Sequence, residues 1–337
     1  MKEDERIPER EIIHTPPEFA VAEEELHAHV GEEIIAGTSL WKDAWRRLLK
    51  NRLAVFGMIV VILVAIASLV GPEIIKRFNG FSPDYIPSDS KLIKSFAPFT
   101  APDGSFSWTH PMGTDNQGRD ILARVLQGGQ ISLMVGIIAT IVSLLIGVAY
   151  GAVAGYLGGR IDNLMMRFVD ILYSLPYIIL VIVLLAMFRS STPLGQLVLL
   201  FIALGSVSWL TMARIVRGQV LSLKNQEFVL AARATGVSTT RIIFRHIVPN
   251  TLGPVIVYAT LTIPTVMLSE AFLSYLGFGV QPPLASWGSL ATDGIQNIAI
   301  FPWQLIFPGV TMALTLFSLN FLGDGLRDAL DPQMRKV

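Results

Sequence analysis

One polar, basic stretch stands out in an otherwise apolar chain: Glu227-Phe-Val-Leu-Ala-Ala-Arg-Ala-Thr-Gly-Val-Ser-Thr-Thr-Arg-Ile-Ile-Phe-Arg-His-Ile-Val-Pro249. Long uncharged runs, residues 190–213 and 248–269, flank it on either side. The polar connection from 214 to 247 exceeds thirty residues, whereas plain helix–helix connections have about two to eight. A connection of this length predicts a structured element with a function of its own.

The stretch has the signals of two short helices joined by a turn. Residues 227–234 are good helix formers and include three alanines. Gly236 follows where helices commonly end with a positive φ, which glycine adopts without steric cost. Ser238 or Thr239 can then cap a second helix over 241–246. We therefore predict a compact helix–turn–helix element between two apolar runs.

The apolar runs predict a membrane protein. Hydrophobic residues make up 52% of the 337, charged residues only 15%, and the mean hydropathy is +0.56. Soluble domains carry about a quarter charged residues. A spanning helix needs roughly 20 apolar residues, and continuous apolarity excludes the alternating pattern of a barrel wall. We predict an all-α membrane protein with six transmembrane helices, from the uncharged runs 53–70, 131–157, 171–188, 190–213, 248–269 and 295–323.

The sequence lacks the motifs of several enzyme classes. There is no cysteine, which excludes disulfides, thiolate catalysis and cysteine-based metal sites. No Gly-x-x-x-x-Gly-Lys-Ser/Thr phosphate loop, His-Glu-x-x-His or Gly-x-Ser-x-Gly motif occurs. We therefore expect no catalytic residue, no metal ligand and no cofactor on this chain. Nucleic acid is not expected among its partners, whereas membrane lipid is.

The basic residues predict the orientation. With six spans and the N-terminus inside, the inner segments hold nineteen of the 26 Lys and Arg residues and the outer segments seven. Basic residues concentrate on the cytoplasmic side of membrane proteins. We expect a multi-pass protein of the bacterial cytoplasmic membrane with both termini in the cytoplasm. The polar first fifty residues contain no signal-peptide core, so 53–71 is expected to be a retained first span.

Two different segments precede that span. Residues 1–38 carry eleven Asp and Glu and little apolar periodicity, which is typical of a disordered cytoplasmic tail. In residues 39–52, Trp41, Trp45, Leu48 and Leu49 share one helical face, and basic residues occupy the rest. This pattern predicts an amphipathic helix at the membrane surface; a plain extension of the first span is the alternative.

Residues 72–130 are predicted to form an irregular extracytoplasmic loop, because six prolines interrupt them. The end of the segment contains His110, Asp115 and Asp120 among turn-forming residues. Either aspartate can cap the next helix. A metal site is the less favoured interpretation, since no second histidine follows.

Glycine and proline predict two features of the bundle. Gly147, Gly151 and Gly155 recur at four-residue spacing, which lets helix backbones approach closely. Pro176 removes a backbone donor within the third run and is expected to kink that span. The kink serves either as a hinge or as packing relief.

Four ordered segments resemble one family. Ala231-Ala232-x-x-x-Gly236, with Pro249 thirteen residues after the glycine, is similar to the EAA loop of bacterial ABC importer permeases. The resemblance is to the peptide and nickel branch, specifically its C permeases. It extends over residues 39–332 and includes Gly113-Thr-Asp-x-x-Gly-Arg-Asp120, Gly277-Phe-Gly-Val-Gln-Pro-Pro283 with Trp287-Gly288, and Gly323-Asp-Gly-Leu-Arg-Asp-x-Leu-Asp-Pro332. Gln130 departs from the family's frequent basic residue, and Val248 from its leucine.

The resemblance implies a MetI-like permease core over 131–332, with an N-terminal interfacial elbow helix and a cytoplasmic coupling helix in the EAA loop, residues 214–249. It implies a peptide permease subunit that forms half of a pathway. Its partners would be a second homologous permease, two ABC ATPase subunits that bind ATP and Mg²⁺, and an extracytoplasmic substrate-binding protein. Dipeptide, oligopeptide, nickel-complex and glutathione systems share these motifs.

The resemblance also implies which residues couple the permease to an ATPase. Ala231 and Ala232 are small enough to sit closely in a partner's groove, and Glu227 and Arg233 can form ion pairs at its rim. Gly236 and Pro249 complete the expected set of ATPase-coupling residues.

A self-sufficient transporter driven by an ion gradient is the alternative function. Such proteins keep ionisable residues deep in the membrane, whereas Asp170 and Glu270 lie near the ends of their runs. Glu270 is a candidate for the translocation pathway or an outer gate; otherwise it is a carboxylate at a helix end in contact with water.

Overall fold

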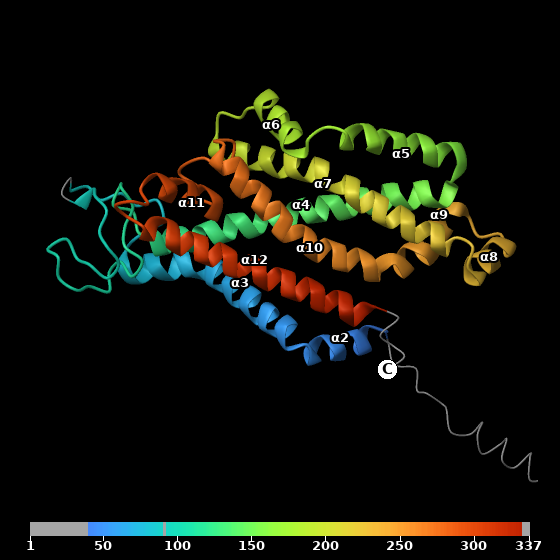
Figure 1. Ribbon diagram of the computed structural model, residues 1–337, viewed down its shortest axis with the longest axis horizontal. Coiled ribbons are helices and arrows are strands. Elements are labelled where there is room, and N and C mark those ends of the chain that lie inside the picture. The colour runs from blue at the N-terminus through green and yellow to red at the C-terminus, as the bar shows by residue number, and fades with distance from the viewer. Residues whose placement is uncertain (1–39, 90–91, 332–337) are drawn as a thin grey trace, which may run out of the picture. The chain divides into compact units, whose positions relative to one another are not determined.

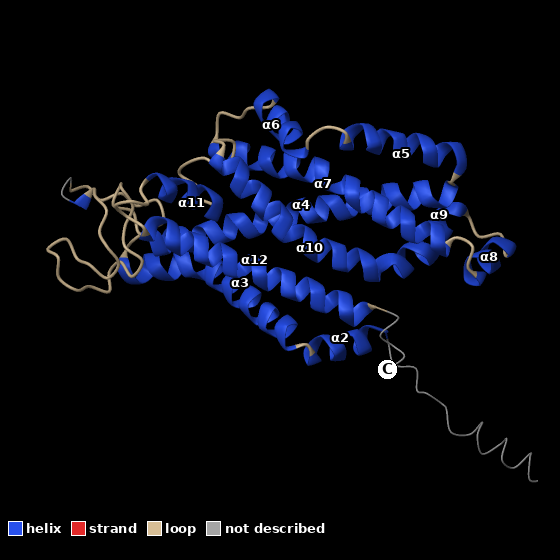
Figure 2. Cartoon of the chain, in the orientation of Figure 1, coloured by secondary structure: helices blue, strands red, loops and turns tan. Residues whose placement is uncertain are grey.

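The computed structural model describes residues 40–89 and 92–331. The predicted acidic tail, residues 1–38, and Pro332 lie outside the described residues. The chain divides between Asp43 and Ala44 into two units, and the larger one begins at Ala44. Within the described ranges the regular structure is helical, with two isolated β-bridges, Thr100–Phe106 and Thr114–Asp120 (Figures 1 and 2). The prediction of an all-α protein is confirmed.

The helices follow one another with short connections, except for one long segment after α3. In chain order they are α2 (Leu40–Lys50), α3 (Arg52–Asn79), α4 (Ile121–Leu157), α5 (Gly159–Tyr173), α6 (Tyr177–Met187), α7 (Pro193–Leu223), α8 (Glu227–Ala234), α9 (Thr239–Arg241), the π-helix η2 (Ile242–Ile247), α10 (Val248–Tyr275), α11 (Trp287–Gln296) and α12 (Trp303–Leu330).

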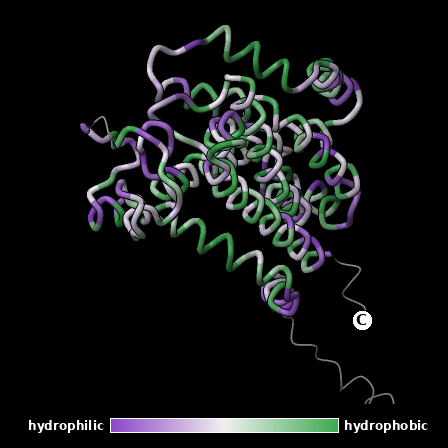
Figure 3. Tube along the Cα trace, turned by 60° about the vertical axis from the view of Figure 1, so that its left-hand side comes forward, coloured by the Kyte–Doolittle hydropathy of each residue, from purple (hydrophilic) through white to green (hydrophobic). Residues whose placement is uncertain are grey.

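Among the described residues, five helices are long and apolar enough to cross a membrane: α3, α4, α7, the continuous stretch Thr239–Tyr275, and α12. The pair α5 and α6, bent by 82°, passes the same test together, so the described residues have six candidate spans if this pair crosses as one. Pro176 lies at this bend as the N-cap of α6, so the expected kink is a full break. Figure 3 shows hydrophobic residues along the helices and hydrophilic residues gathered in the segment between α3 and α4.

Helices α4 and α7 pack along their length and form the centre of the bundle (Figure 1). The glycine repeat of α4 faces α7. A Cβ built on Gly147 would lie 2.6 Å from the Met212 side chain, and one on Gly155 would lie 2.9 Å from the Arg217 carbonyl. Gly151 meets the carbonyl of Ala213 even more closely. The expected close packing at these glycines is confirmed, and it leaves no room for a side chain.

Helix α3 packs beside α12 on one side and exposes the other. Gly57 of α3 meets the Ser318 backbone of α12, and Gly325 meets Ala54. Most of the large apolar side chains of α3 are exposed, including Leu63 at 60%. A helix this apolar with so little burial is expected to face lipid.

In α2, Leu48 is buried beside Ala54 and Ala329, whereas Trp41 and Trp45 are both 53% exposed. The two tryptophans therefore leave a face open to a membrane surface, as an elbow helix requires. The interfacial position itself stays a prediction, since it depends on a bilayer.

The long connection between α3 and α4 is shorter than the predicted 72–130. Helix α3 continues through Pro72 to Asn79 and ends at Gly80, whose φ is 75°. Helix α4 begins ten residues before the apolar run, because the Asp120 carboxylate caps it by accepting from the Ala123 N–H at 2.7 Å. Residues 80–89 and 92–120, which the structure describes, thus belong to the connecting segment 80–120. Gln130 lies within α4 and donates to the Ser68 carbonyl of α3 at 2.7 Å.

The chain does not break at Pro249, although proline commonly ends or kinks a helix. Helices α9, η2 and α10 are continuous, and Pro249 lies in the first turn of α10. The Val248 N–H bonds to the Ile243 carbonyl, five residues back, so the ladder changes register just before the proline. Because these helices are continuous, Pro249 removes one main-chain donor from the ladder, and the change of register lies directly beside it.

Candidate functional site

The predicted helix–turn–helix element projects from one end of the bundle, opposite the segment 80–120 (Figure 1). Helix α8 rests on η2 through Val229 and Ala232, which are buried beside Ile242, Ile243 and Ile247. Its other face, including Glu227 and Ala231, is exposed. The element is therefore a rigid part of the bundle with a free outer surface.

Gly236 ends α8 as the sequence predicts, with a φ of 75°. Its N–H donates to the Arg233 carbonyl at 3.0 Å, and the Val237 N–H donates to the Ala232 carbonyl at 3.1 Å. No atom lies within 4 Å of a Cβ added at Gly236. The backbone conformation, not the space, therefore demands glycine here. Ser238 is the N-cap of α9, but its side chain makes no capping bond.

Two of the expected coupling residues contact their own chain. Ala232 is 8% exposed, so its small size serves the contact with η2 rather than a groove in a partner. The Arg233 Nε donates to the Tyr156 hydroxyl at 3.0 Å, and its guanidinium lies 4.9 Å from the Tyr156 ring centroid. Arg233 thus ties α8 to the end of α4. Glu227, Ala231 and Pro249 remain on the surface.

The sequence reasoning missed three large apolar side chains on this element. Phe228 is 40% exposed, Leu230 48% and Phe244 48%. Apolar side chains on a polar projection are typical of a binding surface. The sequence does contain a sign of this surface. The polar stretch has more large apolar residues than its inner face can bury, because residues 229, 242 and 243 already fill that face.

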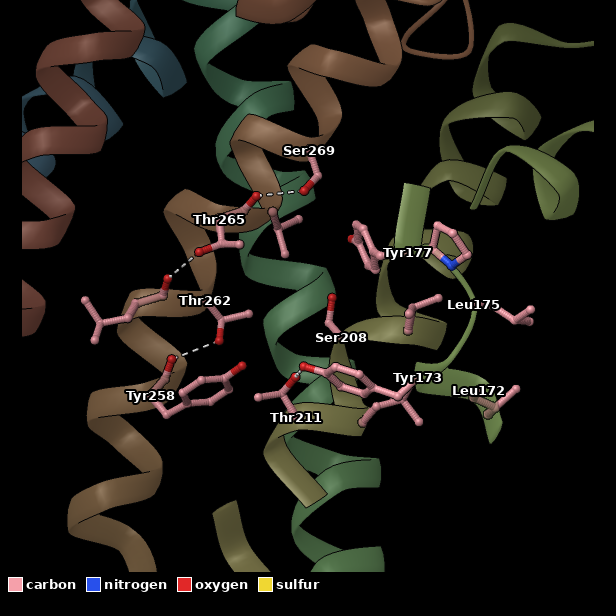
Figure 4. Close-up of a pocket in the computed structure, with 15 residues that line it drawn as sticks. Leu172, Tyr173, Leu175, Tyr177, Ser208, Thr211, Tyr258, Thr262, Thr265 and Ser269 are labelled. Atoms are coloured by element: carbon pink, nitrogen blue, oxygen red, sulfur yellow. Dashed lines mark hydrogen bonds between the residues drawn. The ribbon is translucent and has the colours of Figure 1, made fainter. Parts of the chain in front are cut away.

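A cavity of about 520 Å³ lies midway along the bundle. The bend between α5 and α6 forms one wall, α7 the second and α10 the third (Figure 4). Hydroxyl groups supply its polar surface. They belong to Tyr173, Tyr177, Ser208, Thr211, Tyr258, Thr262, Thr265 and Ser269, and the remaining lining residues are apolar.

Two ion pairs tie α5 to α7 on the side of the cavity toward α8. The Tyr173 hydroxyl lies 3.0 Å from Thr211 Oγ1, and the Arg214 guanidinium lies 4.1 Å from the Tyr173 ring centroid. Arg214 Nη2 also donates to Asp170 at 2.8 Å. Farther along, Arg217 binds Asp162 with two bonds of 2.6 and 2.7 Å.

These pairs differ in their access to solvent. The side chains of Arg214 and Asp170 are 39% and 60% exposed, whereas that of Asp162 is 8% exposed. Asp170 is therefore one half of a surface ion pair between two helices.

Glu270 does not line this cavity, and its burial does not fit the alternative of a carboxylate in contact with water. Its place in the translocation pathway or an outer gate stays a prediction. Glu270 is 1% exposed, and its Oε1 accepts from Ser274 and Ser286, each at 2.7 Å. Ser286 is the N-cap of α11. Glu270 faces the start of α11 because the turn after α10 folds that short helix back onto it. In this structure it fastens α11 to α10.

The polar residues near the start of α4 form ion pairs. His110 Nδ1 lies 2.8 Å from Asp120, and Asp115 accepts from Arg119 and Arg124, each at 2.7 Å. Within residues 40–89 and 92–331, no three His, Asp or Glu side chains gather as a metal site would require. Asp120 is the cap of α4, one of the two alternatives for that helix start.

Two family models match the chain, one near its N-terminus and one over its C-terminal half. Residues 147–336 match the model described as binding-protein-dependent transport system inner membrane component. Residues 39–89 match the N-terminal TM domain of oligopeptide transport permease C. The chain belongs to the binding-protein-dependent permease family. The match includes α7, α8 and α10, which carry the projecting element and most of the cavity wall.

Curated relatives extend the similarity over nearly the whole chain. The oligopeptide transport system permease protein OppC of Bacillus subtilis is 45% identical over 88% of this chain and 91% of its own length. OppC of Escherichia coli K12 is 48% identical over 89% and 94%. The dipeptide transport system permease protein DppC of Bacillus subtilis is 42% identical over 99% and 98%. The chain is thus an integral membrane permease of the OppC and DppC type.

Solved structures of an inward-facing MetNI methionine ABC transporter overlap in part, with a TM-score of 0.49 at 20% identity over 61% of this chain and 96% of the other. Family membership identifies the chain as a permease subunit of an ABC importer, and the alternative of a self-sufficient secondary transporter is wrong.

Proposed function

We propose that this permease forms half of the translocation pathway of an ATP-driven importer of di- or oligopeptides. The observation that carries this is the near-full-length similarity to OppC and DppC permeases. The relatives' names favour peptides over nickel complexes or glutathione.

The partners proposed are those of the family: a second homologous permease, two ABC ATPase subunits and an extracytoplasmic substrate-binding protein. The sequence has no phosphate loop, so ATP and Mg²⁺ would bind to the ATPase subunits, and this chain would bind no cofactor and catalyse no reaction.

We further propose that α8 is the coupling helix, with both chain termini and α8 in the cytoplasm and residues 80–120 outside. The excess of basic residues in the α8 half supports this orientation. The exposed side chains Glu227, Phe228, Leu230 and Ala231 would contact an ATPase, while Ala232, Arg233 and Gly236 hold the helix in place.

Reconstitution tests the function. The complex containing this chain, purified with its partner subunits and placed in proteoliposomes, should take up radiolabelled tripeptide only with the binding protein outside and ATP at the nucleotide-binding side. Uptake driven by a proton or sodium gradient without ATP would contradict the proposal. Uptake of a nickel complex in the absence of peptide would show that the substrate is a nickel complex and not a peptide.

A further inference from the structure

Four of the eight hydroxyl groups that line the cavity donate to main-chain carbonyls of their own helices. On α10, Thr262 donates to the Tyr258 carbonyl at 2.8 Å, Thr265 to Leu261 at 3.1 Å, and Ser269 to Thr265 at 2.9 Å (Figure 4). Ser208 of α7 donates to the Leu204 carbonyl at 2.8 Å. A hydroxyl has one proton and two acceptor lone pairs. These four side chains therefore offer acceptors, rather than donors, to the cavity.

The acceptors are arranged along the cavity wall. Thr262, Thr265 and Ser269 follow one face of α10, since residues three and four apart are neighbours on a helix. At about 1.5 Å per residue, the row is roughly 10 Å long. An extended peptide rises about 3.3 Å per residue and presents an N–H to the same side every second residue. The row thus matches about three residues of an extended chain.

The lining also lacks charge. Its residues are hydroxyl-bearing or apolar, and Arg214 lies outside the cavity, behind Tyr173. No ion pair is available there to distinguish an acidic from a basic peptide side chain. A wall with neutral acceptors and aromatic surface suits what all peptides share, the amide N–H groups of the main chain.

On the basis of the peptide-permease function above, we propose that this cavity is a transit site that holds an extended peptide by its main-chain N–H groups. The acceptors are the hydroxyls of Thr262, Thr265, Ser269 and Ser208. The site makes no specific contacts with peptide side chains, so a single permease can transport peptides of many sequences.

The test is uptake by the complete transporter in proteoliposomes, with Thr265→Val and Ser269→Ala combined. Valine keeps the shape of threonine but removes the acceptor. The double variant should lower the maximal uptake rate of trialanine by about fivefold, the effect of weak neutral hydrogen bonds. The variant-to-wild-type ratio should be the same for peptides carrying Lys or Glu. A trialanine N-methylated at both of its amides should show a ratio near one, because both main-chain donors are already gone.

Thr260→Val is the matched control. Thr260 is on the same helix and donates to the Ile256 carbonyl at 2.9 Å, but it does not line the cavity. Its variant should transport like wild type, and Thr265→Ser should restore the rate. Thr265→Cys gives a second measurement, since the chain has no other thiol. Peptide present during turnover should slow its alkylation.

Several outcomes would overturn the transit site. These are a double variant with wild-type rates, an equal loss for trialanine and its N-methyl analogue, or the same loss in Thr260→Val. Failure of the wild-type complex to import any peptide would instead overturn the proposed function itself. The rate of each variant is divided by the wild-type rate for the same peptide. This ratio does not depend on how tightly that peptide binds to the substrate-binding protein.

Discussion

The proposed coupling through α8 depends on one backbone angle, that of Gly236. Its φ of 75° turns the chain between α8 and α9, and no neighbouring atom would obstruct a side chain. Left-handed conformation costs other residues roughly 1–2 kcal/mol, and β-branched ones more. A substitution would therefore move or loosen α8 without damaging the packed spans.

We expect Gly236→Val to lower ATP-coupled peptide uptake at least about tenfold while the protein still inserts and assembles. Gly253→Val is the control, because Gly253 is also in open space but has no positive φ. Uptake and the amount of assembled complex are measured together. Full uptake by Gly236→Val at normal abundance would show that α8 does not transmit the force.

At the same scale, the contacts of Glu270 could not be predicted from the sequence. The sequence gives its place near the end of an apolar run, but not that Ser286, sixteen residues later, folds back onto it. Replacing Glu270 by Leu leaves two buried hydroxyls without their acceptor, which costs roughly 3 kcal/mol. Glu270→Gln keeps a carbonyl acceptor and should cost much less. The thermal unfolding midpoints of the purified complexes with each variant compare the two substitutions. Equal midpoints would contradict the conclusion that Glu270 fastens α11 to α10.

At the scale of elements, helix ends and close contacts followed from local chemistry, whereas bends and buried partners did not. The sequence left Asp115 and Asp120 as alternative caps of α4, and the spacing of the glycines in α4 predicted close packing, because both patterns are visible within one stretch of sequence. Pro176 marked the bend, but its 82° depends on how α6 packs against α7. The cavity was missed entirely, because its walls come from three separate segments and its hydroxyls look ordinary in each.

The two ion pairs between α5 and α7 should differ greatly in strength. Asp162 is buried and binds Arg217 with two bonds, so Arg217→Ala leaves an unpaired carboxylate and costs about 3 kcal/mol. The pair Asp170–Arg214 is exposed, and Arg214→Ala should cost under about 1 kcal/mol. Thermal unfolding midpoints of the two variants test this order, and a larger loss in Arg214→Ala would reverse it.

At the scale of the whole molecule, the orientation of the chain in the membrane decides which partner can bind at each end of the bundle. The segment 80–120 and α8 lie at opposite ends (Figure 1). Six spans would leave the two termini on one side, and the excess of basic residues is the reason we propose that this side is the cytoplasm. The ATPase can reach α8, and the binding protein the other end, only with this orientation.

The absence of cysteine makes this orientation directly measurable. Asp103→Cys lies in the segment 80–120 and Glu227→Cys on α8, and both positions are exposed. In sealed right-side-out vesicles, a membrane-impermeant maleimide should label Asp103→Cys at once and Glu227→Cys only after permeabilisation. Wild type should stay unlabelled. The reverse order of labelling would place α8 outside, where no ATPase could drive it, and would remove the physical basis of the coupling proposal.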